Sequence, residues 1–257
     1  MAEETEKLHV EDKEQEENTN WVKSIQEITG YEFHDPSLLQ QAFTHPSYDE
    51  GCSSSLDRLA YLGDSVLNLL ITQEHYALYQ DLDPGKLTRL RASNVDTEKL
   101  ARVAVKYGLH KFLRHNLLLL AVQIDEFKEA IKDYPLHSNG LIDTPKVLAD
   151  IFESFFGAIY IDSNCSMDTT WKIAKNLLEP MITPATLITH PVTQLQEMCQ
   201  KKGLPMKIVD LWKETGEFEY VIAEKFIGRA KYTAKRNVAK NKAALNAYYE
   251  IIQELDF

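Results

Sequence analysis

Two acidic residues on one apolar segment constrain this chain more than any other feature. The spacing of its apolar residues predicts a helix over residues 57–72, and Asp57 and Asp64 lie seven positions apart on it. At about 100° per residue, that separation brings both carboxylates to nearly the same face. The rest of the helix surface is apolar, at Leu59, Leu62, Val66, Leu69 and Leu70. The segment therefore predicts a mostly buried helix whose acids need a counter-ion, for which a divalent cation is the usual solution.

A second helix, predicted over residues 145–160, carries a matching acidic pair. Asp150 and Glu153 are three residues apart and so share a face. A solvated helix face is the alternative interpretation, but the neighbours of the pair are apolar: Leu148, Ile151, Phe152, Phe155 and Phe156. Lys146 lies four residues before Asp150, a spacing that favours an ion pair between them over a catalytic lysine.

Three motifs in this order resemble the ribonuclease III family: His45-Pro-Ser-Tyr48, Asp57-Arg-Leu-Ala-Tyr-Leu-Gly-Asp64 and Ala149-Asp-Ile-Phe-Glu153. The resemblance covers residues 21–165, and the sequence of residues 63–70 is most similar to plant ribonuclease III-like proteins. It implies a mainly helical nuclease domain that cleaves double-stranded RNA with Mg²⁺, Mn²⁺ being a possible substitute. It assigns Asp64, Asp150 and Glu153 as metal ligands, with Asp64 and Glu153 catalytic.

The resemblance also implies a homodimer, because in this family the residue at the position of Tyr61 inserts into the partner subunit. Tyr61 would take this role, whereas its default interpretation from the residues alone is a core aromatic. His45 by itself is more typical of a hydrogen-bonded structural histidine than of a ligand.

One departure from the family bears directly on activity. Ala60 stands four residues before Asp64, where the family has a metal-binding glutamate. Two hypotheses follow: an endoribonuclease with impaired catalysis, or a catalytically inactive dimer that binds double-stranded RNA. Asp57 offers partial compensation through water, and both a natural loss and an introduced substitution fit the pattern.

The C-terminal stretch, residues 191–257, changes character. A helix, three alternating segments and a long final helix predict an α+β domain of order α-β-β-β-α, which resembles a double-stranded-RNA-binding domain. The resemblance places Arg236 and Lys240 on phosphates and Gln194 and Glu197 in the minor groove. Asn237 replaces a usual lysine, and a Gly-Pro-x-His loop is missing after Glu214. A protein-interaction module of the same fold is the alternative.

Composition sets the remaining boundaries. The net charge of −11 argues at first against nucleic acid, but residues 1–20 alone carry −6 and residues 191–257 carry +2. Residues 1–20 are predicted to be a disordered acidic tail, residues 115–145 an exposed connection, and residues 166–190 a short helix followed by a proline-rich linker. Three unpatterned cysteines and the lack of a long apolar run predict an intracellular protein, in nucleus or cytoplasm, with no membrane partner.

Overall fold

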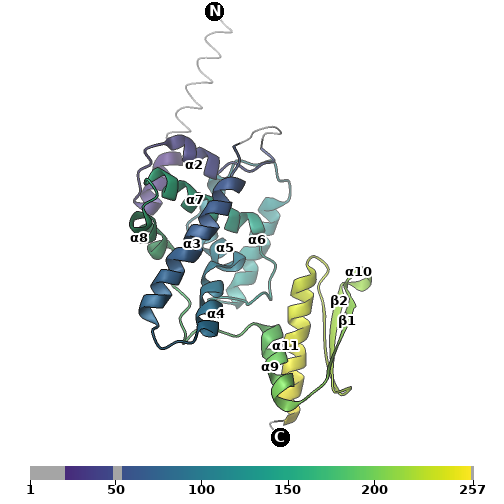
Figure 1. Ribbon diagram of the computed structural model, residues 1–257. Coiled ribbons are helices and arrows are strands. Elements are labelled where there is room, and N and C mark those ends of the chain that lie inside the picture. Colours follow the sequence, from purple (N-terminus) through teal and green to yellow (C-terminus); the bar gives the residue numbers. More distant parts are fainter. Residues whose placement is uncertain (1–20, 49–53, 256–257) are drawn as a thin grey trace, which may run out of the picture. The chain divides into compact units, whose positions relative to one another are not determined.

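The computed structural model describes residues 21–48 and 54–255 (Figure 1). The predictions for residues 1–20 and for the loop 49–53 lie outside these ranges. The described chain divides into two compact units. The first comprises residues 21–120 and 145–182, and the second comprises residues 121–144 and 183–255. The fold class has the predicted architecture, a mainly helical domain followed by a small α+β domain.

The first unit is organised around two helices that cross, α3 (Asp57–Leu78) and α7 (Lys146–Asp162) (Figure 1). Their backbones touch where glycine stands on each helix. A β-carbon on Gly63 would lie 1.8 Å from the carbonyl oxygen of Glu153, and one on Gly157 would lie 2.2 Å from that of Leu59. Any larger side chain at these two positions forces the helices apart, so glycine sets how closely the two acidic helices approach.

The surrounding helices enclose an aromatic and aliphatic core against α7. Phe43, Phe152, Phe155 and Phe156 are all fully buried. Asp35 caps α2 by accepting a hydrogen bond from the backbone of Ser37. Residues 21–29 are helical, and the further helices of this unit are α2 (Pro36–Ala42), α4 (Pro84–Val95), α5 (Thr97–Lys106), η1 (Leu109–Phe112) and α8 (Met167–Leu178).

The prediction of an exposed connection over residues 115–145 is wrong. This segment contains α6 (Leu120–Ala130) and η2 (Ile131–Asp133), and Leu120, Ile124 and Phe127 are buried. These three residues follow the i, i+4, i+7 spacing of a helix face. The turn-like Ser138-Asn-Gly140 later in the segment obscured that periodicity.

The predicted linker is in part fixed to the first unit. Lys99 Nζ donates to the carbonyl of Pro180 at 2.5 Å, and the side chain of Asn94 exchanges two hydrogen bonds with the backbone of Ile182, at 2.8 and 2.9 Å. These partners hold residues 180–182 against α4 and α5. The irregular connection therefore begins at residue 183 and ends at Pro191, where the next helix starts.

The second unit contains the predicted α-β-β-β-α order. Besides η2 and most of α6, its elements are α9 (Pro191–Lys202), β1 (Met206–Leu211), α10 (Trp212–Thr215), β2 (Glu217–Ile222), β3 (Phe226–Lys231) and α11 (Arg236–Leu255). The sheet is antiparallel in the order β1-β2-β3, and α9 and α11 pack side by side on one of its faces (Figure 1). Phe218, Tyr220 and Ile222 point from β2 into the core between sheet and helices. No helix within residues 21–48 and 54–255 is long and apolar enough to cross a membrane.

Candidate active site

Asp64 on α3 and Asp150 on α7 lie close enough to Glu153 for their charges to act on its carboxyl. Asp64 follows the contact glycine Gly63 and is exposed, and its carboxylate accepts a hydrogen bond from Asn68 Nδ2 at 2.8 Å. Asp150 and Glu153 lie on α7 and are half-buried. Lys146 Nζ forms an ion pair with the Asp150 carboxylate, which confirms the predicted i, i+4 pair.

The electrostatics of Glu153 show that these acids act on one another. The pKa of its carboxyl is raised to about 7, chiefly by burial and then by the charges of Asp150 and Asp64, while Lys146 lowers it. Burial by itself lowers the pKa of Lys146, but the hydrogen bond and charge of Asp150, followed by the charges of Glu153 and Asp57, raise it overall. Lys146 is therefore a counter-ion within a cluster that carries an excess of negative charge.

The donor set suits Mg²⁺, which prefers carboxylate oxygens. Burial and then the charges of Asp150 and Asp64 raise the pKa of Glu153, and a divalent cation would offset both effects. In residues 21–48 and 54–255, however, no three Asp, Glu, His or Cys side chains already converge on one point. The acids of α3 and α7 suit a metal in their charge and in their oxygen ligands. In this structure the charge of Asp150 is balanced by Lys146.

Position 60 has no carboxylate to offer. Ala60 is buried, with 6% of its surface exposed, on the turn of α3 before Asp64. Asp57 lies one turn earlier and is exposed, and its carboxylate accepts a hydrogen bond from Ser55 Oγ at 3.3 Å. The structure thus places the potential substitute Asp57 at the start of the helix and an apolar methyl group at position 60.

The interpretation of Tyr61 as a core aromatic is wrong, as is that of α3 as a mostly buried helix. Tyr61 is 82% exposed, Tyr76 is 79% exposed and Leu69 is 50% exposed. At 100° per residue these three side chains fall within about 80° of one another around α3. The helix buries one face against α7 and presents an apolar face to the outside.

In the second unit, the predicted RNA-binding residues lie on two packed helices. Gln194 is half-buried and Glu197 exposed on α9, and Lys240 is half-buried on the first turns of α11. Arg236, which is expected from the sequence to be free to contact a phosphate, is instead paired with an acid. Its Nε and Nη2 donate to Asp210 Oδ2 at 2.8 and 2.5 Å.

Sequence reasoning missed Asp210 because nothing local marks it. The residue lies on β1, which is adjacent to β2, and its carboxylate meets Arg236 from 26 positions away in the chain. The guanidinium also lies 5.3 Å from the ring centre of Phe218. Only the strand register could have indicated the contact: Asp210 pairs with Phe218, which faces the helices.

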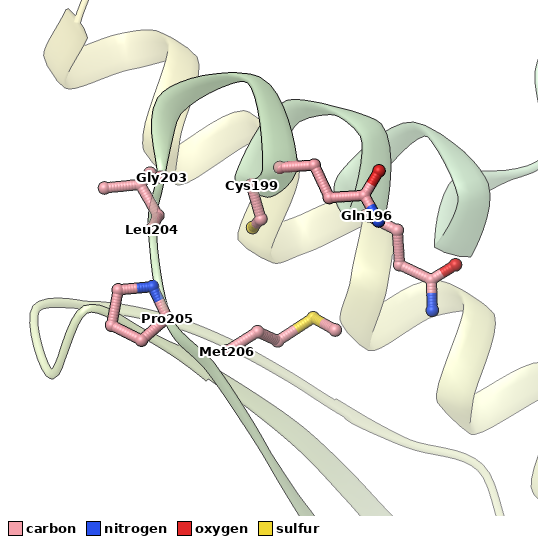
Figure 2. A pocket seen from close by; sticks show the side chains of 7 residues that line it. Gln196, Cys199, Gly203, Leu204, Pro205 and Met206 are labelled. Carbon is pink, nitrogen blue, oxygen red and sulfur yellow. The ribbon is translucent and has the colours of Figure 1, made fainter.

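A pocket of about 510 Å³ opens between α9 and β1 in the second unit (Figure 2). Cys199, Leu204 and Met206 give it an apolar wall, and Gln196 lies at its rim (Figure 2). Burial raises the pKa of the Cys199 thiol. None of the four residues predicted to contact RNA lines this pocket.

Comparison with known proteins defines the class. Residues 57–164, which contain both acidic helices, match the family described as "Ribonuclease III domain". "Ribonuclease 3-like protein 3" of Oryza sativa subsp. japonica is 46% identical over 237 residues, which is 91% of this chain and 79% of that protein. The chain belongs to the ribonuclease III family, and within it to the plant ribonuclease III-like proteins.

Longer relatives match over only part of their length. "Endoribonuclease Dicer homolog 1" of Arabidopsis thaliana is 39% identical over 93% of this chain but only 14% of that protein, and "Ribonuclease 3-like protein 2" of the same plant is 40% identical over 75% of this chain and 50% of that protein. The solved nuclease domain of ribonuclease III from Campylobacter jejuni is 26% identical over 62% of this chain and 96% of that chain, with a TM-score of 0.48.

Proposed function

We propose that this protein is an endoribonuclease that hydrolyses double-stranded RNA at the acid cluster of α3 and α7. The observation that carries the proposal is the grouping of Asp64, Asp150 and Glu153, in which burial and then the charges of Asp150 and Asp64 raise the pKa of Glu153 to about 7. Membership of the ribonuclease III family supports the same conclusion. Asp64, Asp150 and Glu153 are the proposed ligands for Mg²⁺, with Mn²⁺ as a possible substitute, and Asp64 and Glu153 act in catalysis.

The bound metal supplies charge stabilisation and an activated water for phosphodiester hydrolysis. The protein's own residues prepare the site. Asn68 holds one oxygen of Asp64 in place by its hydrogen bond. Lys146 forms an ion pair with Asp150, and this carboxylate would have to leave the ammonium group to bind a metal.

Ala60 weakens the activity in this proposal. A lost metal ligand reduces the rate by orders of magnitude, each factor of ten corresponding to about 1.4 kcal/mol of activation barrier. A second candidate function is a dimeric double-stranded-RNA-binding protein without catalysis. The observation that favours it is the burial of Ala60 at the point where a fourth carboxylate is expected.

Both candidates include a homodimer and an RNA-binding module. The exposed apolar face of α3, comprising Tyr61, Leu69 and Tyr76, is the proposed dimer surface, because contact with a second copy would remove these large side chains from water. In the second unit, Gln194, Glu197, Arg236 and Lys240 are the proposed RNA contacts. A protein-binding role for this unit stays the alternative, since Asp210 already neutralises Arg236.

Cleavage of a long uniform RNA duplex with Mg²⁺ tests the two candidates. The chain itself is compared with Ala60→Glu and Asp150→Ala. Weak cleavage that rises in Ala60→Glu and disappears in Asp150→Ala supports the impaired enzyme. Binding without cleavage, followed by cleavage only in Ala60→Glu, supports the inactive dimer built on a nuclease scaffold. Duplex binding with no cleavage by any of the three chains contradicts a nuclease site on α3 and α7.

A further inference from the structure

Two loops of the first unit, residues 43–48 and 114–117, are joined into one rigid structure. Thr44 and Arg114 form a parallel β-bridge, so the residues that follow them project from the same side of the paired backbones. Those residues are His45 and His115. Four hydrogen bonds join the loops: Arg114 N to Phe43 O at 2.8 Å, His45 N to Arg114 O at 2.9 Å, Asn116 N to Ser47 Oγ at 3.1 Å and Asn116 Nδ2 to Tyr48 O at 3.2 Å.

Both imidazoles are held in the same tautomer. His45 Nδ1 accepts a hydrogen bond from the backbone N–H of Ser47 at 3.0 Å, and His115 Nδ1 accepts one from the N–H of Leu117 at 3.0 Å. A backbone amide can only donate, so each Nδ1 is the unprotonated nitrogen and each Nε2 carries the proton. The pair therefore presents two Nε2–H donors from one side of the bridge.

The hydrogen bonds of the two rings make each Nε2–H a hydrogen-bond donor. Burial lowers the pKa of His115, and the neighbouring His45 lowers it further. Protonation of either ring would also set an Nδ1–H against a backbone N–H. In the observed hydrogen-bond geometry each Nε2 holds the proton of its ring, so Nε2 does not bind a metal. An anion is the ligand that two neighbouring N–H donors recognise.

The position of the loops indicates which anion. Leu56 N, directly before Asp57, donates to Thr44 O at 2.9 Å, and Ser154 Oγ, directly after Glu153, donates to Ala42 O at 2.7 Å. The first bond joins the loop 43–48 to the start of α3, and the second joins α7 to the residue of α2 that precedes this loop. The Arg114 guanidinium, 4.3 Å from the ring centre of Tyr48, adds positive charge to the same loops.

We infer that His45 and His115 form a phosphate-binding site that holds the backbone of an RNA duplex beside the acid cluster. The inference rests on the proposed function, because RNA is the ligand. The two Nε2–H groups donate to the non-bridging oxygens of one phosphodiester, away from the bond that is cut. They bind and position RNA, and they take no part in proton transfer.

Substitution of the histidines by asparagine or glutamine distinguishes a role in RNA binding from a role in stabilising the loops. In His45→Asn and His115→Asn, the side-chain oxygen can still accept from the N–H two residues on, as in an Asx-turn, but the Nε2–H donor is lost. In His45→Gln, an amide N–H is restored near the Nε2 position while the turn loses its acceptor. His34→Asn is the matched control, since His34 is an exposed histidine held by Asp162 at the C-terminal end of α7.

The readouts are duplex-RNA affinity of the full chain, with Ca²⁺ in place of Mg²⁺, and the melting temperature. The two Asn variants are expected to bind about tenfold more weakly at an unchanged melting temperature, the size of one hydrogen bond to a charged group. His45→Gln recovers part of the affinity but melts lower, and His34→Asn binds normally. The salt dependence of binding is unchanged, because a neutral ring releases no counter-ion.

Three results would overturn the inference. Asn variants that bind as tightly as the unmodified chain remove the site and leave the proposed function intact. Asn variants whose weaker binding follows a lower melting temperature, without recovery in His45→Gln, assign the histidines to structure alone. An unmodified chain that does not bind duplex RNA rejects the inference and the proposed function together.

Discussion

Gly63 lies directly against the backbone carbonyl of Glu153, so that a β-carbon at position 63 would stand 1.8 Å from that oxygen. Gly157 makes the reciprocal contact with the carbonyl of Leu59, at 2.2 Å from its own hypothetical β-carbon. The first contact joins a proposed metal ligand to the residue before another, Asp64. The spacing of the acids is therefore set by backbone packing and not by flexible side chains.

Gly63→Ala is expected to lower the free energy of unfolding by about 3 kcal/mol, because the added methyl group must separate two packed backbones. The gain in helix propensity, about 1 kcal/mol, is too small to offset this. Urea denaturation measures the change. Gly85→Ala is the control, since the nearest atom to its β-carbon is the side-chain Oδ1 of Asp83 at 3.2 Å, and it should change stability by no more than about 0.5 kcal/mol. Equal stability of the two variants would show that the crossing can open freely.

The stability of the metal-free chain is expected to depend on pH through Glu153. Burial, then Asp150 and Asp64, raise the pKa of its carboxyl from 4.5 to about 7 in the folded state. The folded protein therefore holds a proton that the unfolded chain has already lost between these pH values. This stabilisation is complete below pH 4.5 and is lost as the pH rises through about 7.

Melting temperatures in EDTA across this pH range provide the measurement. The melting temperature of the unmodified chain minus that of Glu153→Gln should fall as the pH rises from 4.5 to 7, because only the unmodified chain loses the stabilising proton. Glu129→Gln removes an exposed carboxylate of α6 that pairs with Lys132, and should retain the slope of the unmodified chain. Parallel curves for the unmodified chain and Glu153→Gln would contradict the raised pKa.

Features set by local spacing could be predicted from the sequence. The two acidic helices follow a helical period, and the Lys146–Asp150 pair follows from its i, i+4 separation. The α-β-β-β-α order follows from alternation and turn residues. Each of these depends on residues close together in the chain, where sequence patterns carry most information.

Features set by the tertiary environment were not predictable. Tyr61 has a large aromatic side chain of the kind that is often buried. Only the packing of α3 on α7 determines that it faces outward, with 82% of its surface exposed. The contact between Arg236 and Asp210 joins a helix to a strand edge. The hydrogen bonds that fix residues 180–182 come from Asn94 and Lys99, more than 80 positions away. None of these contacts leaves a periodic signal.

The exposed face of α3 makes the oligomeric state testable. Tyr61→Glu is expected to shift a dimer towards monomer, because it places a charge within an apolar surface that must be desolvated on association. Light scattering after size exclusion measures the mass over a range of concentrations. Tyr249→Glu is the control, since Tyr249 is 53% exposed on α11, outside the proposed surface. A monomer in the unmodified chain would reject the dimer, and a dimer unaffected by Tyr61→Glu would place the association on another surface.

The pair formed by Arg236 and Asp210 limits what the second unit can contribute to RNA binding. Both side chains are exposed, yet Asp210 accepts two hydrogen bonds from the guanidinium and its pKa is lowered chiefly by that contact. A phosphate must compete with this carboxylate for Arg236. Asp210→Asn keeps an oxygen for its hydrogen bond with the backbone of Trp212 but removes the competing charge.

Asp210→Asn is therefore expected to bind duplex RNA more tightly than the unmodified chain, with a slope of log K against log salt steeper by about one released counter-ion. Arg236→Gln in the same background should return both quantities to their original values, which assigns the gain to this guanidinium and not to the general loss of one negative charge. Glu219→Gln is the matched control: it frees Arg229, which pairs with Glu219 across β2 and β3 on the sheet face opposite the helices. An equal gain from Glu219→Gln would reduce the effect to net charge, whereas a gain confined to Asp210→Asn places RNA at the start of α11.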